Sequence, residues 1–184
     1  MLIVETGAGL PTAESYATVD EFNQYHTDRQ NAFTLSGLQI EAALRKATEY
    51  IEQVYTGRWA GYRNKDTQAL DWPRSYVPRE ASVGYPTGGN YTPEGEGYYP
   101  FNVLPVQLKQ ATIILALKSV DADLLPDFDR LPKRETVGQL TVEYAENKSP
   151  VVTYPAIDRL LSRFFKDVNA GSIGGASVVK LSRA

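Results

Sequence analysis

Cysteine is absent from this 184-residue sequence, and histidine and methionine occur once each. The lack of cysteine excludes disulfides, thiolate metal sites and cysteine nucleophiles, and a single histidine excludes metal sites built from several imidazoles. The longest apolar run, Ile113–Leu117, is far shorter than the roughly 20 residues that span a bilayer. The N-terminal segment lacks the basic region of a secretory signal, so we expect a protein made in the cytoplasm that contacts no membrane.

The chain also lacks an excess of positive charge. Its 19 lysines and arginines stand against 22 aspartates and glutamates, which gives a net charge of −3 and an isoelectric point near 5.3. Because no overall positive field draws the protein to nucleic acid, we expect weak binding of single-stranded DNA at physiological salt, through a local surface. The length suits one domain, which we expect over residues 1–169, followed by a flexible glycine-rich tail over 170–184.

Four segments have the apolar spacing of amphipathic helices. They cover residues 18–26 after the N-cap Thr18, residues 36–56 before Gly57, a stretch that begins at Pro105, and residues 155–169. The predicted fold class is therefore mainly α, a small bundle of about four helices around one core. The residues expected to share this core are Ile40, Leu44, Ile51, Ala111, Leu115, Leu160, Leu161 and Phe164.

Residues 73–104 have no helical or strand periodicity. Proline, glycine and tyrosine dominate this segment, which is longer than most connections inside a domain. We expect a long loop excursion that docks against another protein or another copy of the chain, because tyrosine offers a large contact area at low entropy cost. The tyrosines expected to make such contacts are Tyr85, Tyr91, Tyr98 and Tyr99.

Residues 139–145 show the one convincing alternation of apolar and polar positions, with Leu140, Val142 and Tyr144 on one face. A single strand cannot satisfy its own backbone hydrogen bonds. Three partners are open from the sequence: residues 133–137 in a hairpin, the long loop, or another subunit. We therefore expect a strand or hairpin near 134–145 whose apolar residues help to contact a neighbouring molecule.

A search for catalytic and metal-binding patterns yields none. His26 lies at the end of a predicted helix and is interpreted as structural. The Gly-Ala-Gly sequence at 7–9 lacks the third glycine of a dinucleotide-binding loop and is interpreted as a turn. The acidic group at 121–129, with Asp121, Asp123, Asp127 and Asp129, lacks the spacing of a calcium loop. We predict no enzyme activity, metal or cofactor, and a small enzyme built on carboxylates is the least favoured alternative.

Aromatic and basic residues alternate after the second predicted helix. Arginines that meet phosphates and aromatics that stack on bases are typical of single-strand binding, so this segment is a possible nucleic-acid contact. Packing of the aromatics in the core explains the same pattern, and the negative net charge favours packing. The residues concerned are Arg58, Trp59, Tyr62 and Arg63.

Several pieces taken together, in their order and spacing, resemble a known family. They are AESY at 13–16, ALRKATEYIEQVYTGRW at 43–59, ALDWPRS at 69–75, VQLKQATIILAL at 106–117, KRETVGQLTVEYA at 133–145 and YPAI at 154–157. The order and spacing are similar to those of the head–tail connector proteins of tailed phages, also called adaptor or head-completion proteins. The same group carries the label of DnaT-like single-stranded-DNA-binding proteins. The resemblance covers about residues 5–168, and the long loop at 79–100 departs from it.

The resemblance implies a structural virion protein without catalytic activity. Such adaptors form a ring of about twelve copies on the portal protein, in the neck between capsid and tail. The ring extends the channel for packaged DNA, which passes without sequence-specific binding, and offers a surface to a tail or stopper protein. The resemblance also implies a C-terminal tail that binds the portal. The candidate residues for this contact are Ser177, Val178, Val179, Lys180, Leu181 and Arg183. The alternative is a DnaT-like protein that binds single-stranded DNA.

Overall fold

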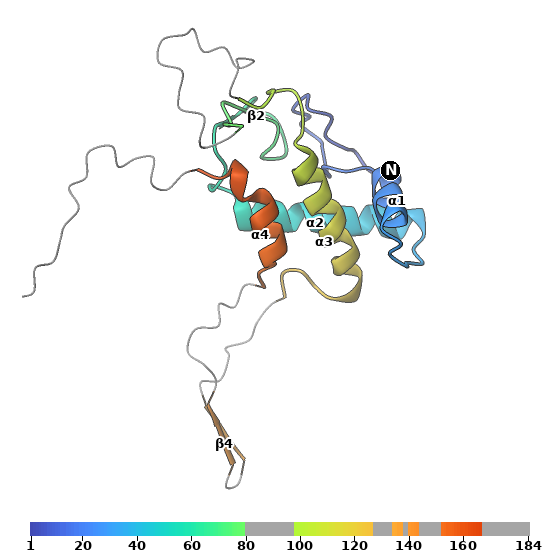
Figure 1. Cartoon of the computed structure of the whole chain (residues 1–184), viewed down its shortest axis with the longest axis vertical. Coiled ribbons are helices and arrows are strands. Elements are labelled where there is room, and N and C mark those ends of the chain that lie inside the picture. The colour runs from blue at the N-terminus through green and yellow to red at the C-terminus, as the bar shows by residue number, and fades with distance from the viewer. Residues whose placement is uncertain (80–97, 127–133, 138–139, 144–151, 167–184) are drawn as a thin grey trace, which may run out of the picture.

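In the computed structural model, four α-helices form the body of the protein (Figure 1). The structure describes residues 1–79, 98–126, 134–137, 140–143 and 152–166. The helices are α1 (Val19–Asp28), α2 (Gly37–Tyr55), α3 (Val106–Asp121) and α4 (Pro155–Leu161), and a 3₁₀ turn at Ser162–Phe164 follows α4. The mainly α prediction is confirmed.

The first two helices begin where the sequence places their caps. The Thr18 hydroxyl accepts the Glu21 N–H at 3.0 Å, while the Glu21 carboxylate accepts the Thr18 N–H at 2.9 Å. Ser36 and Gln39 make the same reciprocal pair at the start of α2. These capping boxes satisfy backbone donors that the first helical turn leaves free. Gly57, with a φ of +76°, lies directly after the C-cap of α2, as its position predicts.

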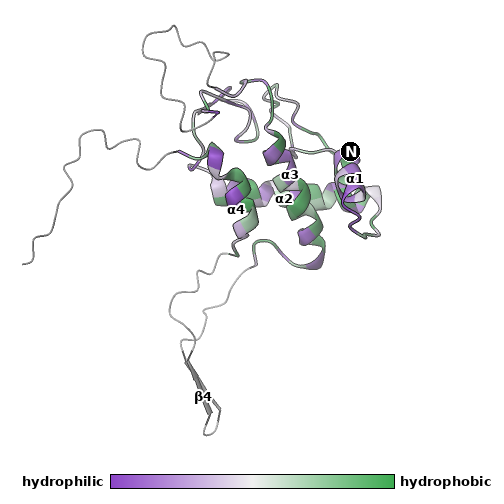
Figure 2. Cartoon of the chain, in the orientation of Figure 1, coloured by the Kyte–Doolittle hydropathy of each residue, from purple (hydrophilic) through white to green (hydrophobic). Residues whose placement is uncertain are grey.

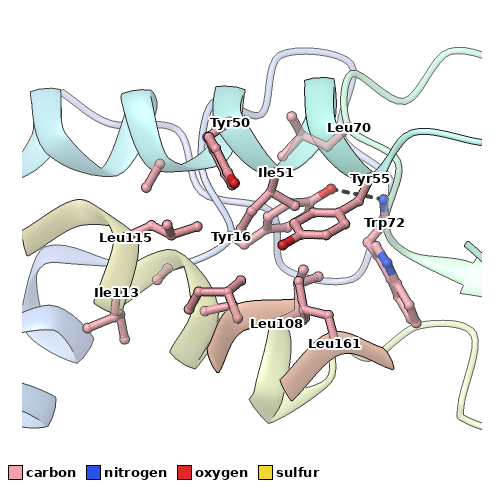
Figure 3. Packing of buried hydrophobic residues seen from close by; sticks show 14 of the residues in the cluster. Tyr16, Tyr50, Ile51, Tyr55, Leu70, Trp72, Leu108, Ile113, Leu115 and Leu161 are labelled. Atoms are coloured by element: carbon pink, nitrogen blue, oxygen red, sulfur yellow. Dashed lines mark hydrogen bonds between the residues drawn. The ribbon is translucent and has the colours of Figure 1, made fainter. Parts of the chain in front are cut away.

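The core lies among α2, α3 and α4, and α3 contacts both of the other helices (Figures 1 and 3). Figure 2 shows hydrophobic residues on α2, α3 and α4 where these helices lie together. All but one of the residues predicted to form the core are buried, and Leu160 is half-buried at its edge. The N-terminal segment adds side chains that periodicity did not predict, because Tyr16 and Ala17 precede α1 and are fully buried. No helix in the described part of the chain has the length and apolar character needed to cross a bilayer.

The last helix is shorter than the sequence predicts. The spacing predicts a helix from Pro155 to about Asn169, but α4 ends at Leu161 and Phe165 is extended, with φ −84° and ψ 155°. The cause is pairing with a distant segment. The Ala60 N–H donates to the Phe164 carbonyl at 2.8 Å, and the Lys166 N–H donates to the Arg58 carbonyl at 2.8 Å. These bonds replace helical ones, so the prediction of a helix through Phe165 is wrong.

Two antiparallel strand pairs accompany the helices. In the first, β1 (Tyr62–Arg63) pairs with β2 (Arg74–Ser75), so the start of the predicted excursion is structured. In the second, β3 (Arg134–Val137) pairs with β4 (Leu140–Glu143) in the register Val137 opposite Leu140. Of the three partners left open for the predicted strand, the hairpin is therefore confirmed. Among the described elements, β3 and β4 contact only each other.

The described ends of the long excursion lie side by side. Pro78 and Tyr98 form an antiparallel bridge, and the Tyr99 N–H donates to the Val77 carbonyl at 2.8 Å. Several residues with predicted contact roles lie outside the described residues: Tyr85, Tyr91, Tyr144, Ser177, Val178, Val179, Lys180, Leu181 and Arg183. Asp127 and Asp129 of the acidic group and the predicted tail at 170–184 also lie outside them.

Candidate functional site

The aromatic residues that follow α2 form a cluster under α4. Trp59 is 1% exposed, and its ring centroid lies 5.8 Å from that of Trp72 in an edge-on arrangement. Trp72 in turn meets Phe164 edge-on at 5.5 Å. Burial of this kind leaves neither face of the Trp59 indole open for a base. The packing interpretation of Trp59 therefore agrees with the structure.

The other three residues of the candidate nucleic-acid contact are exposed but do not form one platform. The Arg58 guanidinium lies 4.3 Å from the centroid of the Phe165 ring and 3.8 Å from the Asp158 carboxylate. Tyr62 is 74% exposed on β1, opposite Ser75.

Arg63 is exposed as well and donates to the Gln68 carbonyl. The structure thus exposes these three residues and buries Trp59, with which the sequence grouped them.

Tyr98 and Tyr99, the two described tyrosines of the excursion, have different surroundings. Tyr98 meets Tyr76 edge-on at 5.7 Å, and Tyr76 is 38% exposed. Tyr99 is half-buried and meets Phe164 edge-on at 5.1 Å. Tyr99 therefore contributes to the edge of the core.

A polar network joins α2 to the loop before β2, and Figure 3 shows one of its bonds, from the Trp72 N–H to the Tyr16 hydroxyl. The Tyr16 hydroxyl donates to Glu52 at 2.5 Å and accepts the Trp72 N–H at 3.1 Å. The second Glu52 oxygen accepts the Asp71 N–H at 2.8 Å. Burial, together with the nearby Asp71 carboxylate, raises the pKa of Glu52 to about 7. The Tyr16 hydroxyl and both Glu52 carboxylate oxygens are thus hydrogen-bonded within the protein, and these bonds fix the loop before β2 against α2.

Arg74 completes the attachment of this loop. Its side chain is buried and donates to the carbonyls of Ala60 and Gly61, each at 2.8 Å, and of Asp71 at 3.2 Å. Asp71 Oδ1 lies 3.9 Å from the guanidinium and offsets its charge. A guanidinium engaged in this way is not available to bind a phosphate.

His26 of α1 is buried against α3. Its Nδ1 lies 3.0 Å from the Asn31 amide, its Nε2 lies 3.4 Å from the Ile113 carbonyl, and the rings of Phe22 and Phe33 meet it edge-on. Burial lowers the pKa of His26, so the neutral form is favoured. These contacts agree with the structural role predicted for it. Among the described residues, no three acidic or histidine side chains are grouped as metal ligands.

The Gly-Ala-Gly turn encloses a carboxylate of its own chain. Glu5 is buried, and its side chain accepts the N–H groups of Gly7 at 2.8 Å, Gly9 at 2.9 Å and Leu10 at 2.7 Å. Both glycines have positive φ values, so their amides can turn toward one acceptor. The turn predicted from the sequence is confirmed, and its amides are occupied by Glu5.

The outer side of α4 and of the turn after it carries a group of cations that the sequence analysis missed. Arg159, Arg163 and Lys166 are exposed there, and Lys166 is hydrogen-bonded through its backbone to Arg58. The signal available in the sequence was the spacing of 159 and 163, four residues apart and opposite the apolar stripe of the helix.

Comparison with known proteins gives one match. A family described as "Putative DnaT-like ssDNA binding protein" matches the chain over residues 1–184. The chain belongs to this family. Neither a curated protein nor a solved structure matches it. Membership of the DnaT-like family confirms that part of the predicted resemblance over the whole chain, while the head–tail adaptor role within it is a proposal.

Proposed function

We propose that this member of the DnaT-like family is a structural virion protein, a ring-forming head–tail adaptor of a tailed phage. In this role it binds the portal in the neck of the particle and extends the DNA channel. It also offers a surface to a tail or stopper protein. The order and spacing of the sequence pieces support this role. The proposed role requires no enzyme activity.

The observation that carries the proposal is the hairpin of β3 and β4. Within the described part of the chain, these strands pair with each other and contact no other helix or strand. Their outer edges therefore carry backbone donors and acceptors that a strand from another molecule can satisfy. In a ring, each copy has a neighbour on either side and meets it through the same pair of surfaces. Each neighbour can therefore supply such a strand.

Binding of single-stranded DNA is the second candidate, and the family description favours it. The described surface that suits it best is near β1 and β2, where Tyr62 and Tyr76 are exposed beside Arg63. Aromatic rings and an arginine are the residues that bind unpaired bases and phosphates. Against it stand the net charge of −3 and the burial of Trp59.

A phage that lacks a functional copy of the gene separates the two candidates. An adaptor is needed only in assembly, so we expect normal phage DNA synthesis together with full or leaking heads that have no tails. A single-strand-binding protein acts on replicating DNA, so its loss reduces phage DNA synthesis before any head is filled. Quantitative PCR of phage DNA and electron microscopy of the lysate measure the two outcomes. Reduced DNA synthesis with tails attached to the few heads formed would contradict the adaptor role.

A further inference from the structure

Four cations lie together on the side of the protein that α4 covers. Arg159 and Arg163 are exposed and four residues apart, Arg159 on α4 and Arg163 in the 3₁₀ turn that follows it. Lys166 follows, and its N–H bonds to the carbonyl of Arg58, whose guanidinium lies over the Phe165 ring. We call Arg58, Arg159, Arg163 and Lys166 the α4 cationic surface. Figure 1 shows α4 on the outside of the helical body.

Several cations elsewhere in the described structure are neutralised or buried, whereas Lys46, Arg63 and Lys65 are exposed single cations. Arg45 is paired with Glu14 at 3.0 Å, and Lys109 is paired with Glu21 at 2.6 Å. Arg74 is buried on three carbonyls. By contrast, among the described residues the one carboxylate within ion-pair distance of the α4 cationic surface is Asp158, 3.8 Å from Arg58. An acidic protein thus has a local surface with an excess of about three positive charges, which is the requirement for binding a polyanion.

The surroundings of this surface favour the backbone of a nucleic acid over its bases. Trp59 and Phe164 are buried beneath it, and Arg58 covers the half-buried ring of Phe165. The described surface therefore offers no open aromatic face on which an unpaired base can stack. Contacts to phosphate alone favour duplex DNA, which carries one charge per about 1.7 Å of its axis, against about 3.4 Å for one strand.

We propose that the α4 cationic surface binds the phosphate backbone of duplex DNA. The choice of duplex over single strand rests partly on the adaptor role, in which packaged DNA passes the protein. The binding carries no base sequence information, because arginine and lysine contact only phosphates. Affinity is weak at physiological salt and rises as salt is lowered.

Fluorescence anisotropy with a labelled duplex of about 20 base pairs and the full-length protein tests the proposal. Four phosphate contacts give a slope of about −3.6 in a plot of log affinity against log salt, or about 100-fold weaker binding at 200 mM than at 50 mM salt. We expect Arg163→Glu to weaken binding at least 10-fold at 50 mM salt and to flatten the slope by about 1. Arg159→Glu is the second variant, and exposure of both positions lets the variants fold.

Lys46→Glu is the matched control, because Lys46 is exposed on α2 and the substitution changes the net charge equally, from −3 to −5. We expect it to weaken binding less than 2-fold. Equal weakening by Arg163→Glu and Lys46→Glu, or no binding of duplex at 50 mM salt, would overturn the proposal. Tighter binding of an unpaired dT strand of equal length than of the duplex would show that the surface binds single-stranded DNA instead. Equal competition by polyglutamate would point to an acidic protein instead. None of these results depends on ring formation, so failure here and failure of the adaptor role are distinguishable.

Discussion

The Tyr16 hydroxyl donates a 2.5 Å hydrogen bond to the carboxylate of Glu52, across 36 residues of sequence. The same hydroxyl accepts the Trp72 N–H, so a residue before α1, a residue of α2 and the loop before β2 share one contact. This contact positions the buried indole of Trp72 beside Trp59 and Phe164. The polar network therefore fixes the aromatic cluster on which the segment after α4 rests.

Stability should depend on pH through Glu52. Its pKa is raised from 4.5 to about 7 in the folded protein, so between these values the folded state holds a proton that the unfolded state has lost. The free energy of unfolding should therefore fall as pH rises from about 4.5 to 7, by up to about 3 kcal/mol, and change little above 7 from this cause. Urea unfolding at a series of pH values measures it. The difference in the free energy of unfolding between the unchanged protein and the Glu52→Gln variant should shrink toward low pH. A difference that stays constant with pH would show that Glu52 does not cause the pH dependence.

Leu161→Ala should destabilise the protein by about 2 to 5 kcal/mol, because the side chain is fully buried where α4 meets the core. Leu38→Ala is the matched control, since Leu38 is 77% exposed on α2. We expect the control to change the free energy of unfolding by less than about 0.5 kcal/mol. Urea unfolding of both variants checks the pair. A loss below about 0.5 kcal/mol for Leu161→Ala would show that α4 does not pack as described.

Gly7→Ala should lower the free energy of unfolding by at least about 2 kcal/mol. Gly7 has a φ of +101°, and an added Cβ would lie 1.9 Å from the Asn102 carbonyl oxygen. The strain would also disturb the amides that hold Glu5. Gly37→Ala is the control, because nothing lies within 4 Å of its Cβ position and alanine favours the helix by up to about 1 kcal/mol. Thermal unfolding should separate the two variants, and equal melting temperatures would contradict the account of the turn.

Sequence periodicity was sufficient for α1, α2 and α3 and for most of the core. The residues of α2 and α3 that recur every three or four positions are the buried ones, and Thr18 and Ser36 cap the helices that follow them. These features depend on neighbours in the sequence, so local patterns predict them. The hairpin was predictable for the same reason, since β3 and β4 are separated by two residues.

Features made by distant segments were not predictable from local patterns. The end of α4 at Leu161 depends on backbone bonds to Arg58 and Ala60, about a hundred residues earlier in the chain. The bonds of Glu52 to Tyr16 and to the Asp71 N–H likewise join positions 36 and 19 residues apart in the sequence. The aromatic and basic residues near 58–63 gave an ambiguous signal, because stacking on bases and packing in a core use the same side chains.

Deletion of residues 86–97 should leave the helical content unchanged and block assembly. The bridge between Pro78 and Tyr98 holds the two ends of the excursion together, and seven residues, 79–85, remain to connect them. Connections of about this length are common between paired strands. Circular dichroism should therefore match the full chain, while ring formation or portal docking is lost. Normal assembly of the deletion variant would show that the excursion makes no contact between molecules.

Electron microscopy of the purified protein mixed with its cognate portal tests the adaptor role most directly. We expect a ring of extra density on the portal, with the tail after Asn169 as an anchor, so a chain truncated there should fold and leave most portals bare. The same chain with only Arg163→Glu should still form the ring, because DNA is absent from the mixture. If the truncated chain occupies the portals as fully as the full-length protein does, the tail is not needed for portal binding. Portals that remain bare with the full-length protein present would contradict the adaptor role itself.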